Sequence, residues 1–174
     1  SHLIWIDADM GIPNDCVPKL LKRGVDVIGV PVPLKGYNAD GSPVLNIGEI
    51  LNIEDGLAET THVGNAVLMF SRKAVDALIE ISTEYVDDPG YSRGETTGDK
   101  AWDVFYVGVM EDGIYRPEDY STCYKLRKLG FKIYLDMTIP VKHNGMHGFQ
   151  TTPEILNKYI PKQDNLIRLV TGGR

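Results

Sequence analysis

The chain has 174 residues, of which 43% are hydrophobic, 24% charged and 9% aromatic, as in an ordinary folded domain. A domain of this size buries about 70% of its surface on folding, so it needs neither disulfides nor a structural metal for stability. The formal charge is −6, from 18 basic and 24 acidic residues, and no run of Lys or Arg stands out. A nucleic acid is therefore not an expected partner.

Cysteine usage and the apolar runs indicate the compartment. Cys16 and Cys123 lie far apart in predicted helices, so we expect two buried free thiols rather than a disulfide or a metal-binding pair. The longest apolar runs, residues 3–6 and 25–32, are far shorter than the roughly 18 residues of a membrane span. With no signal-peptide pattern, we expect a cytoplasmic protein without a transmembrane segment.

The first elements in chain order are a strand, a helix and a second strand. Residues 3–6 form a continuous apolar run, which is typical of a strand buried on both faces of a parallel sheet. Asn14 or Asp15 can cap a helix that ends at Gly24, and residues 25–30 form the next strand. A crossover of this length predicts parallel neighbouring strands joined with right-handed topology.

The middle of the chain begins with residues 31–56, which are rich in Gly, Pro, Asn and Asp. We expect a flexible excursion here, with an irregular hairpin formed by residues 44–47 and 50–53. Residues 63–70 predict another buried strand, after which Ser71 caps an amphipathic helix.

The remaining elements alternate between loops, strands and helices. Residues 87–100 are polar and contain three glycines, which predicts a long loop of the kind that often acts as a lid. Residues 104–109 predict a strand, 117–129 a helix and 131–135 the last strand, followed by a helical tail over 152–174. The order of elements indicates one α/β domain.

Two acids follow the first predicted strand directly. Asp7 and Asp9 are two residues apart, and in an extended chain such residues point the same way, so their carboxylates can converge on one ligand. Carboxylates together with substrate phosphates are common ligands of Mg²⁺ and Mn²⁺. The pattern predicts a divalent-cation site for a phosphorylated substrate, although a short D-x-D also occurs where acids merely end a strand in a solvated turn.

Two other interpretations of the D-x-D motif must be weighed against this cation site. A calcium loop of the EF-hand type fails, because Pro18 stands where its bidentate glutamate should be. The D-x-D also resembles that of haloacid-dehalogenase-like phosphatases, and residues 98–103 resemble their later acidic motif; Asp7 would then form an aspartyl-phosphate. Against this, residues 89–97 are polar where that motif should follow a buried strand, and Gly11 stands where Thr or Val is usual.

Several blocks in one order resemble glycosyltransferases of the GT-A fold, closest to family 2-like enzymes, over residues 3–149. These blocks are LIWIDADMGIPNDCVPKLL, DVIGVPVPLK, HVGNAVLMFSRKAVDAL and YRPEDYSTCYKLRKLGFKIYLDMTIPVKHNG. The resemblance implies a single domain over residues 1–174 with a Rossmann-like, mostly parallel sheet flanked by helices. It also implies metal-dependent, inverting transfer of a sugar from a nucleotide-diphosphate donor to a hydroxyl group of a glycan or other acceptor.

The resemblance implies the metal ligands. In such enzymes the D-x-D carboxylates hold Mn²⁺ or Mg²⁺ against the donor diphosphate. Asp9 would then be the first metal ligand, Asp7 would be shared between the metal and the donor ribose, and His143 would be a further ligand. A neutral imidazole can ligate Mn²⁺ or bind a diphosphate oxygen. The alternative for His143 is an ordinary surface or packing histidine.

The resemblance also implies a catalytic base at the start of the helix that follows Pro117. Acids in a first helical turn are common because the helix dipole favours them, which is the alternative explanation of Glu118 and Asp119. In inverting relatives one acid of this pair takes the proton from the acceptor. We expect Asp119 in that role, with Glu118 as the alternative base or an acceptor ligand. The dipole should lower the pKa of the base, leaving it ionised at neutral pH.

Further substrate contacts follow from the same resemblance. Gly64 and Asn65 correspond to a segment that approaches the donor sugar, where a glycine lets the backbone come close. Trp102, with Tyr106 nearby, can offer an aromatic platform to an acceptor sugar, although large aromatic residues more often serve packing.

GT-A enzymes carry a nucleoside-binding half before the D-x-D, whereas here the motif begins at residue 7. The resemblance therefore implies that this half is missing from the chain, and that its strands come from another segment, a second polypeptide or an oligomer. Without that half, we expect the strand of residues 3–6 to become an exposed sheet edge or to lose its cover. A non-catalytic glycan-binding module that has lost donor binding is the remaining alternative.

Overall fold

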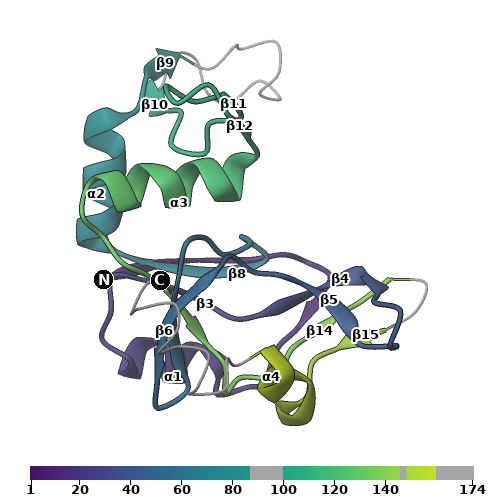
Figure 1. The fold of residues 1–174 in the computed structure, drawn as a ribbon. Helices are drawn as coiled ribbons and strands as arrows, with labels where there is room; N and C mark the ends of the chain where they lie inside the picture. The colour runs from purple at the N-terminus through teal and green to yellow at the C-terminus, as the bar shows by residue number, and fades with distance from the viewer. Residues whose placement is uncertain (87–99, 146–147, 160–174) are drawn as a thin grey trace, which may run out of the picture.

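The computed structural model describes residues 1–86, 100–145 and 148–159, and it shows an α/β protein (Figure 1). Its main sheet has six strands in the order β1-β8-β3-β13-β7-β6. The strands are β1 (His2–Ile6), β8 (Val67–Ser71), β3 (Val27–Gly29), β13 (Ile133–Asp136), β7 (Leu57–Thr60) and β6 (Ile50–Glu54).

The sheet is mixed and mostly antiparallel, so the prediction of a mostly parallel sheet is wrong. β8 runs antiparallel to both β1 and β3, and β7 runs antiparallel to both β13 and β6. Among these six strands, the parallel pair is β3 with β13. The strands β1 and β3 do share one direction, as expected of a strand-helix-strand unit. They are not neighbours, because β8 lies between them.

The first strand lies at one edge of the sheet and is not buried on both faces. Leu3, Trp5 and Ile6 are 45%, 44% and 39% exposed, because β1 pairs with β8 on one side only. The expectation of a sheet strand is confirmed, and so is that of an exposed edge. The expectation of burial on both faces is wrong.

The predicted helices form, and their ends follow local signals. They are α1 (Cys16–Lys22), α2 (Arg72–Ile81), α3 (Glu118–Lys128) and α4 (Pro153–Tyr159). Ser71 caps α2 by accepting a 3.1 Å hydrogen bond from the Ala74 N–H. Gly24 and Gly130, which follow α1 and α3, take the positive φ angles of 66° and 86° that favour glycine after a helix. The rest of the predicted tail, residues 160–174, lies outside the described residues.

The core has two parts, one on each face of the sheet. Alternate residues of β8 separate them: Leu68 and Phe70 belong to one cluster, and Val67 and Met69 belong to the other. Helices α2 and α3 cover the first face, and α1 covers the opposite face (Figure 1). No helix in the described part of the chain is long and apolar enough to cross a membrane.

Both cysteines are free and buried, as predicted. Burial raises the pKa of the Cys16 thiol to about 11 and that of the Cys123 thiol to about 12. Both therefore stay protonated near neutral pH and behave as small apolar core residues.

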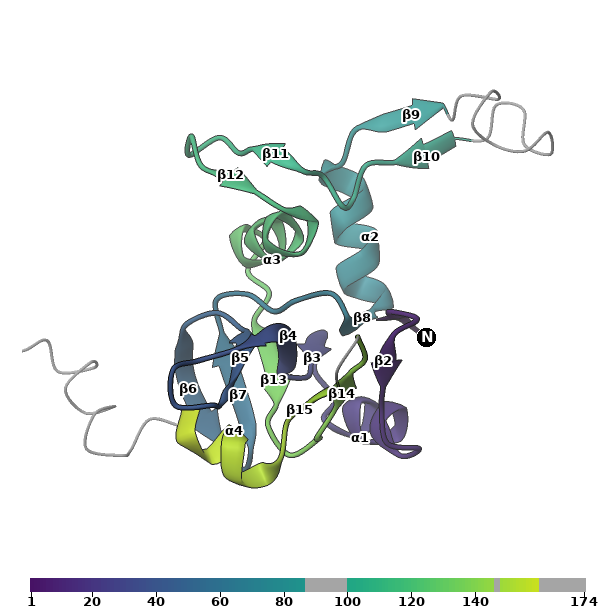
Figure 2. The same ribbon diagram turned by 90° about the vertical axis from the view of Figure 1, so that its right-hand side faces the viewer.

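Short strands complete the structure. They are β2 (Met10–Gly11), β4 (Val32–Tyr37), β5 (Pro43–Asn46), β9 (Glu84–Val86), β10 (Lys100–Trp102), β11 (Gly108–Val109), β12 (Tyr115–Arg116), β14 (Lys142–His143) and β15 (Phe149–Gln150). Figure 2 shows β9 to β12 on the far side of α2 and α3 from the main sheet. Residues 104–109 were expected to form one strand, but only 108–109 do. Of the predicted loop 87–100, residues 87–99 lie outside the described part.

The expected flexible excursion over residues 31–56 is instead ordered. Strand β4 pairs with β5, and β6 pairs with β7, so the predicted pairing of 44–47 with 50–53 is wrong. The turn between β6 and β7 explains the difference. Asp55 and Gly56 have φ angles of 48° and 73°, the left-handed pair that a two-residue hairpin turn requires.

Candidate functional site

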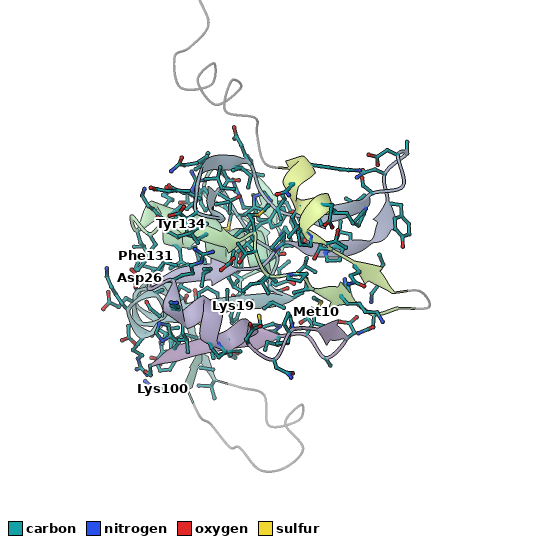
Figure 3. The ribbon with its side chains drawn as sticks, turned by 90° about the horizontal axis from the view of Figure 1, so that it is seen from below. Met10, Lys19, Asp26, Lys100, Phe131 and Tyr134 are labelled. Carbon is teal, nitrogen blue, oxygen red and sulfur yellow. The ribbon has the colours of Figure 1, made fainter. Side chains whose placement is uncertain are left out.

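The D-x-D turn lies beside the segment that carries His143. Strand β2, which follows Asp9 directly and begins with Met10 (labelled in Figure 3), pairs antiparallel with β14. In this pairing Met10 is opposite His143. This register brings the His143 Nε2 to 3.2 Å from the Asp9 Oδ2. The backbone N–H and the side-chain amide of Asn144 each donate to the Asp9 carbonyl at 2.9 Å. The backbone of the D-x-D turn is thus fixed to β14.

The contact made by His143 Nδ1 determines whether Nε2 carries a hydrogen in the neutral ring. His143 Nδ1 lies 2.8 Å from the Pro33 carbonyl oxygen, which can only accept, so Nδ1 carries the hydrogen. In the neutral ring, Nε2 then presents a lone pair to the Asp9 carboxylate. Two ligands about 2.1 Å from one cation and at right angles to each other are about 3 Å apart. Their 3.2 Å separation would thus let the Asp9 oxygen and the His143 nitrogen reach one cation. The oxygen suits Mn²⁺ or Mg²⁺, and the nitrogen suits Mn²⁺ better than Mg²⁺.

Lys35 on β4 also reaches this carboxylate. Its Nζ donates to the Asp9 Oδ2 at 2.7 Å, and both side chains are partly exposed. The hydrogen bond from Lys35 is the largest influence on Asp9, and the pKa of Asp9 lies below its ordinary value. Asp9 is therefore a carboxylate at neutral pH, with its Oδ2 directed toward positive charge.

Asp7 has different partners. Its Oδ1 accepts a 2.8 Å hydrogen bond from the Trp5 indole, and its N–H donates to the Ala66 carbonyl at 3.0 Å. Within the described residues, no three His, Cys, Asp or Glu side chains form a group that could hold a metal ion. The structure thus brings together Asp9 and His143 and leaves Asp7 outside their contact.

A second cluster surrounds the start of α3. Asp119 is only 7% exposed, and its Oδ1 accepts a 2.8 Å hydrogen bond from the Tyr120 N–H. Its Oδ2 accepts a longer bond, 3.4 Å, from the Asn46 amide. Burial is the largest influence and raises the pKa of Asp119, so the expected lowering is wrong. The loss of water outweighs the hydrogen bonds that stabilise the charged form.

Two asparagines hold the acids of this cluster. Asn46 accepts a 2.9 Å hydrogen bond from the Tyr120 hydroxyl in addition to its bond to Asp119. Asn65 donates to the Glu118 Oε1 at 3.4 Å. The predicted substrate residue Asn65 and the predicted acids therefore meet. Asn46 was missed because it lies in the segment expected to be flexible, and no sequence motif marks it.

Gly64 provides space for Asn46. A Cβ atom at position 64 would lie 2.3 Å from the Asn46 Nδ2 and 2.9 Å from its Cγ. The close approach that we predicted for this glycine therefore occurs with a side chain of the protein itself, and its approach to a donor sugar stays a prediction.

We expect Gly64→Ala to destabilise the fold by about 1–3 kcal/mol, the usual cost of overpacking. Asn46 must move to admit the methyl group, and its bonds to Asp119 and Tyr120 then weaken. Urea unfolding measures the effect. Gly36→Ala is the matched control, because nothing lies within 4 Å of the added Cβ and no positive φ is required. Equal stability of the two variants would show that Asn46 is not held firmly.

The β4–β5 hairpin connects the two clusters. Its first strand supplies the Pro33 carbonyl and Lys35 to the Asp9 cluster, and its second strand ends in Asn46 of the Asp119 cluster. Val32 is paired with Asn46, and paired Cα atoms are about 5 Å apart. Asp9 and Asp119 therefore contact the two strands of one hairpin, Asp9 through Lys35 and Asp119 through Asn46.

Trp102 lies outside both clusters. It is on β10 opposite Glu84 and is 39% exposed. Within the described residues, no hydrogen bond or ring contact joins it to Asp9 or Asp119. Its segment does approach the D-x-D strand, since the Phe105 ring lies 5.6 Å from that of Trp5. The acceptor role of Trp102 stays a prediction.

An aromatic hollow of about 300 Å³ lies along the exposed face of α3. The His62 and Tyr120 rings are 3.8 Å apart in its wall, and the Arg116 guanidinium lies over the Tyr124 ring at 4.1 Å. Because Tyr120 also contacts Asp119 and Asn46, this hollow adjoins the acid cluster.

Fold and site together define an α/β protein with a candidate cation site at one sheet edge and a buried carboxyl group nearby. Comparisons of the chain with protein-family models, with curated proteins and with solved structures found no match.

Proposed function

We propose that the chain is a glycosyltransferase of the GT-A type, which transfers a sugar from a nucleotide-diphosphate donor to a hydroxyl acceptor with the help of Mn²⁺ or Mg²⁺. One observation carries the proposal. Asp9 and His143 are 134 residues apart in sequence, each is a metal ligand by resemblance, and the pairing of β2 with β14 places them 3.2 Å apart.

The Asp9 Oδ2 and the His143 Nε2 would hold the cation, leaving its other positions for water and the donor diphosphate. The Pro33 carbonyl fixes the tautomer and the orientation of the imidazole, as an outer hydrogen bond commonly does for a metal-bound histidine. When bound, the cation supplies Lewis acidity to the departing nucleoside diphosphate.

Asp119 is the proposed base, which takes the proton from the acceptor hydroxyl. Burial raises its pKa toward neutrality, which makes the carboxylate a stronger base while leaving it able to accept a proton. The Tyr120 N–H and Asn46 hold its two oxygens. Direct attack of the deprotonated hydroxyl on the anomeric carbon inverts the configuration there.

We place the acceptor sugar in the aromatic hollow along α3, and the aromatic platform at Trp102 stays a separate prediction. The exposed rings suit the apolar faces of a sugar, and the hollow adjoins Asp119. Further strands, from another segment or from a partner chain, would pair with the open edge of β1 and contribute to nucleoside binding.

We expect Asp9→Asn to weaken Mn²⁺-dependent binding of the donor by at least about tenfold, since it removes a charged ligand. Calorimetric titration of UDP- and GDP-sugars, with and without Mn²⁺, measures the effect. Asp15→Asn is the control, because it removes an exposed carboxylate that pairs with Lys19 and leaves the D-x-D intact. Unchanged metal-dependent donor binding by Asp9→Asn would overturn the metal assignment. Trapping of fluoroberyllate on Asp7 would point to a phosphatase instead.

A further inference from the structure

The Asp9 Oδ2 has two partners of different kinds. The Lys35 ammonium lies 2.7 Å from it, and the His143 Nε2 lies 3.2 Å from it. In the neutral ring the nitrogen presents a lone pair, because Nδ1 holds the hydrogen that it donates to Pro33. Lys35 is thus a positive charge that the chain itself brings to the Asp9 carboxylate.

We propose that Lys35 occupies the cation site in the free protein and competes with the divalent cation for the Asp9 Oδ2. The inference rests on the proposed function, since it takes Asp9 and His143 as the metal ligands. An ammonium group and a divalent cation bound to one carboxylate oxygen repel each other. Metal binding therefore requires Lys35 to leave Asp9.

After it leaves Asp9, the Lys35 ammonium has a new partner in the donor diphosphate. Lys35 lies on β4, whose Pro33 carbonyl holds His143, so its side chain stays beside the site after it leaves Asp9. Its side chain is 47% exposed and free to turn into solvent. A lysine ammonium binds phosphate oxygens well as a point charge. Lys35 thus exchanges the Asp9 carboxylate for the donor diphosphate when metal and nucleotide bind.

The variant Lys35→Met tests both the competition of Lys35 with the cation and the binding of Lys35 to the diphosphate. We expect the variant to bind Mn²⁺ alone about two- to fivefold more tightly than the wild type, the factor that corresponds to the loss of an exposed ion pair. In the presence of saturating Mn²⁺, we expect it to bind UDP and GDP several-fold more weakly. Electron paramagnetic resonance of free Mn²⁺ measures the first effect, and calorimetry with the nucleotides measures the second.

Lys132→Met is the matched control. It removes one positive charge and an exposed 2.8 Å ion pair with Glu59 in the main sheet. We expect wild-type affinity for Mn²⁺ and for the nucleotides in this variant. An equal tightening in both variants would reflect net charge alone and would overturn the proposal.

The outcomes separate this inference from the proposed function. If Asp9→Asn loses Mn²⁺ while Lys35→Met binds it with wild-type or lower affinity, the competition is refuted and the cation site stands. If Lys35→Met binds the nucleotides as tightly as the wild type does, the transfer of Lys35 to the diphosphate is refuted. If neither the wild type nor Lys35→Met binds Mn²⁺, both the inference and the proposed metal site fail.

Discussion

Asp119→Asn is expected to lower the rate of sugar transfer by about 10²- to 10⁴-fold, the usual contribution of a general base. The asparagine keeps the size of the side chain and an oxygen that can accept from the Tyr120 N–H. It cannot take a proton from the acceptor. Because neither Asp9 nor His143 is altered, Mn²⁺-dependent binding of the donor should stay at the wild-type level.

The rate can be followed without a known acceptor, since water replaces the sugar hydroxyl in Mn²⁺-dependent hydrolysis of UDP- and GDP-sugars. Glu118→Gln is the neighbouring control, because Glu118 lies at the same helix start and contacts Asn65. If Glu118→Gln abolishes hydrolysis of the UDP- and GDP-sugars while Asp119→Asn hydrolyses them at the normal rate, then Glu118 is the base and Asp119 is not.

The pH profile gives an independent check of the base. Burial raises the pKa of Asp119, so the group must be deprotonated at a higher pH than an ordinary aspartate. As the pH falls through this raised pKa, the base becomes protonated and the rate decreases. We therefore expect an acidic limb in kcat/KM above the ordinary aspartate range. An acidic limb within that range would argue against Asp119 as the base.

The parts of the fold that the sequence predicted well depend on local signals. Ser71 caps α2 through a bond to a residue only three positions away, and Gly24 and Gly130 end their helices by their own φ angles. These contacts need no knowledge of the rest of the chain. The helices and the inner strands β8, β3 and β13 were therefore predicted within a few residues, whereas the inner strand β7 was not predicted.

The errors in the sheet arise from contacts between distant residues. The position of β8 between β1 and β3 is set by register with both strands and is not visible in any one segment. A local signal was also missed. Asp55-Gly56 stands between two short apolar runs, which is a strong hairpin signal, and it would have paired residues 50–54 with 57–60.

The acids of the candidate site and His143 could be singled out from the sequence because they stand in recognisable motifs, and their roles stay predictions. The residues that orient them were not predicted. Lys35 and Asn46 lie on the β4–β5 hairpin, and only the fold brings them to Asp9 and Asp119. The predicted direction of the Asp119 pKa shift was wrong for a related reason. A helix start can be read from sequence, but the burial that dominates the pKa cannot.

The second large effect is expected at the ion pair between Arg23 and Asp136. The guanidinium donates to both carboxylate oxygens of Asp136, at 2.7 and 3.1 Å, and the Asp136 side chain is 1% exposed. Arg23 also donates to the Asp55 carbonyl at 3.1 Å. This one side chain thus ties the end of α1 to the end of β13 and to the β6–β7 turn.

Asp136→Asn should lower the free energy of unfolding at neutral pH by about 3 kcal/mol, the lower end of the range for a broken buried pair. The lower end applies because Arg23 is 23% exposed and can regain water. Urea unfolding measures the loss. Asp76→Asn is the control, since its pair with Arg72 is exposed and should contribute less than about 0.5 kcal/mol.

The loss of stability in Asp136→Asn should become smaller as the pH falls. Burial alone would raise the pKa of Asp136, but the hydrogen bonds from Arg23 and Thr138 outweigh it, and the pKa lies below its ordinary value. A carboxyl group with a lowered folded pKa contributes stability above its unfolded pKa, about 3.9, and loses it as the pH falls through the folded pKa. The stabilities of the wild type and Asp136→Asn should therefore converge on acidification. A difference that stays constant from neutral pH to pH values below the folded pKa would show that the carboxylate charge of Asp136 does not carry the effect.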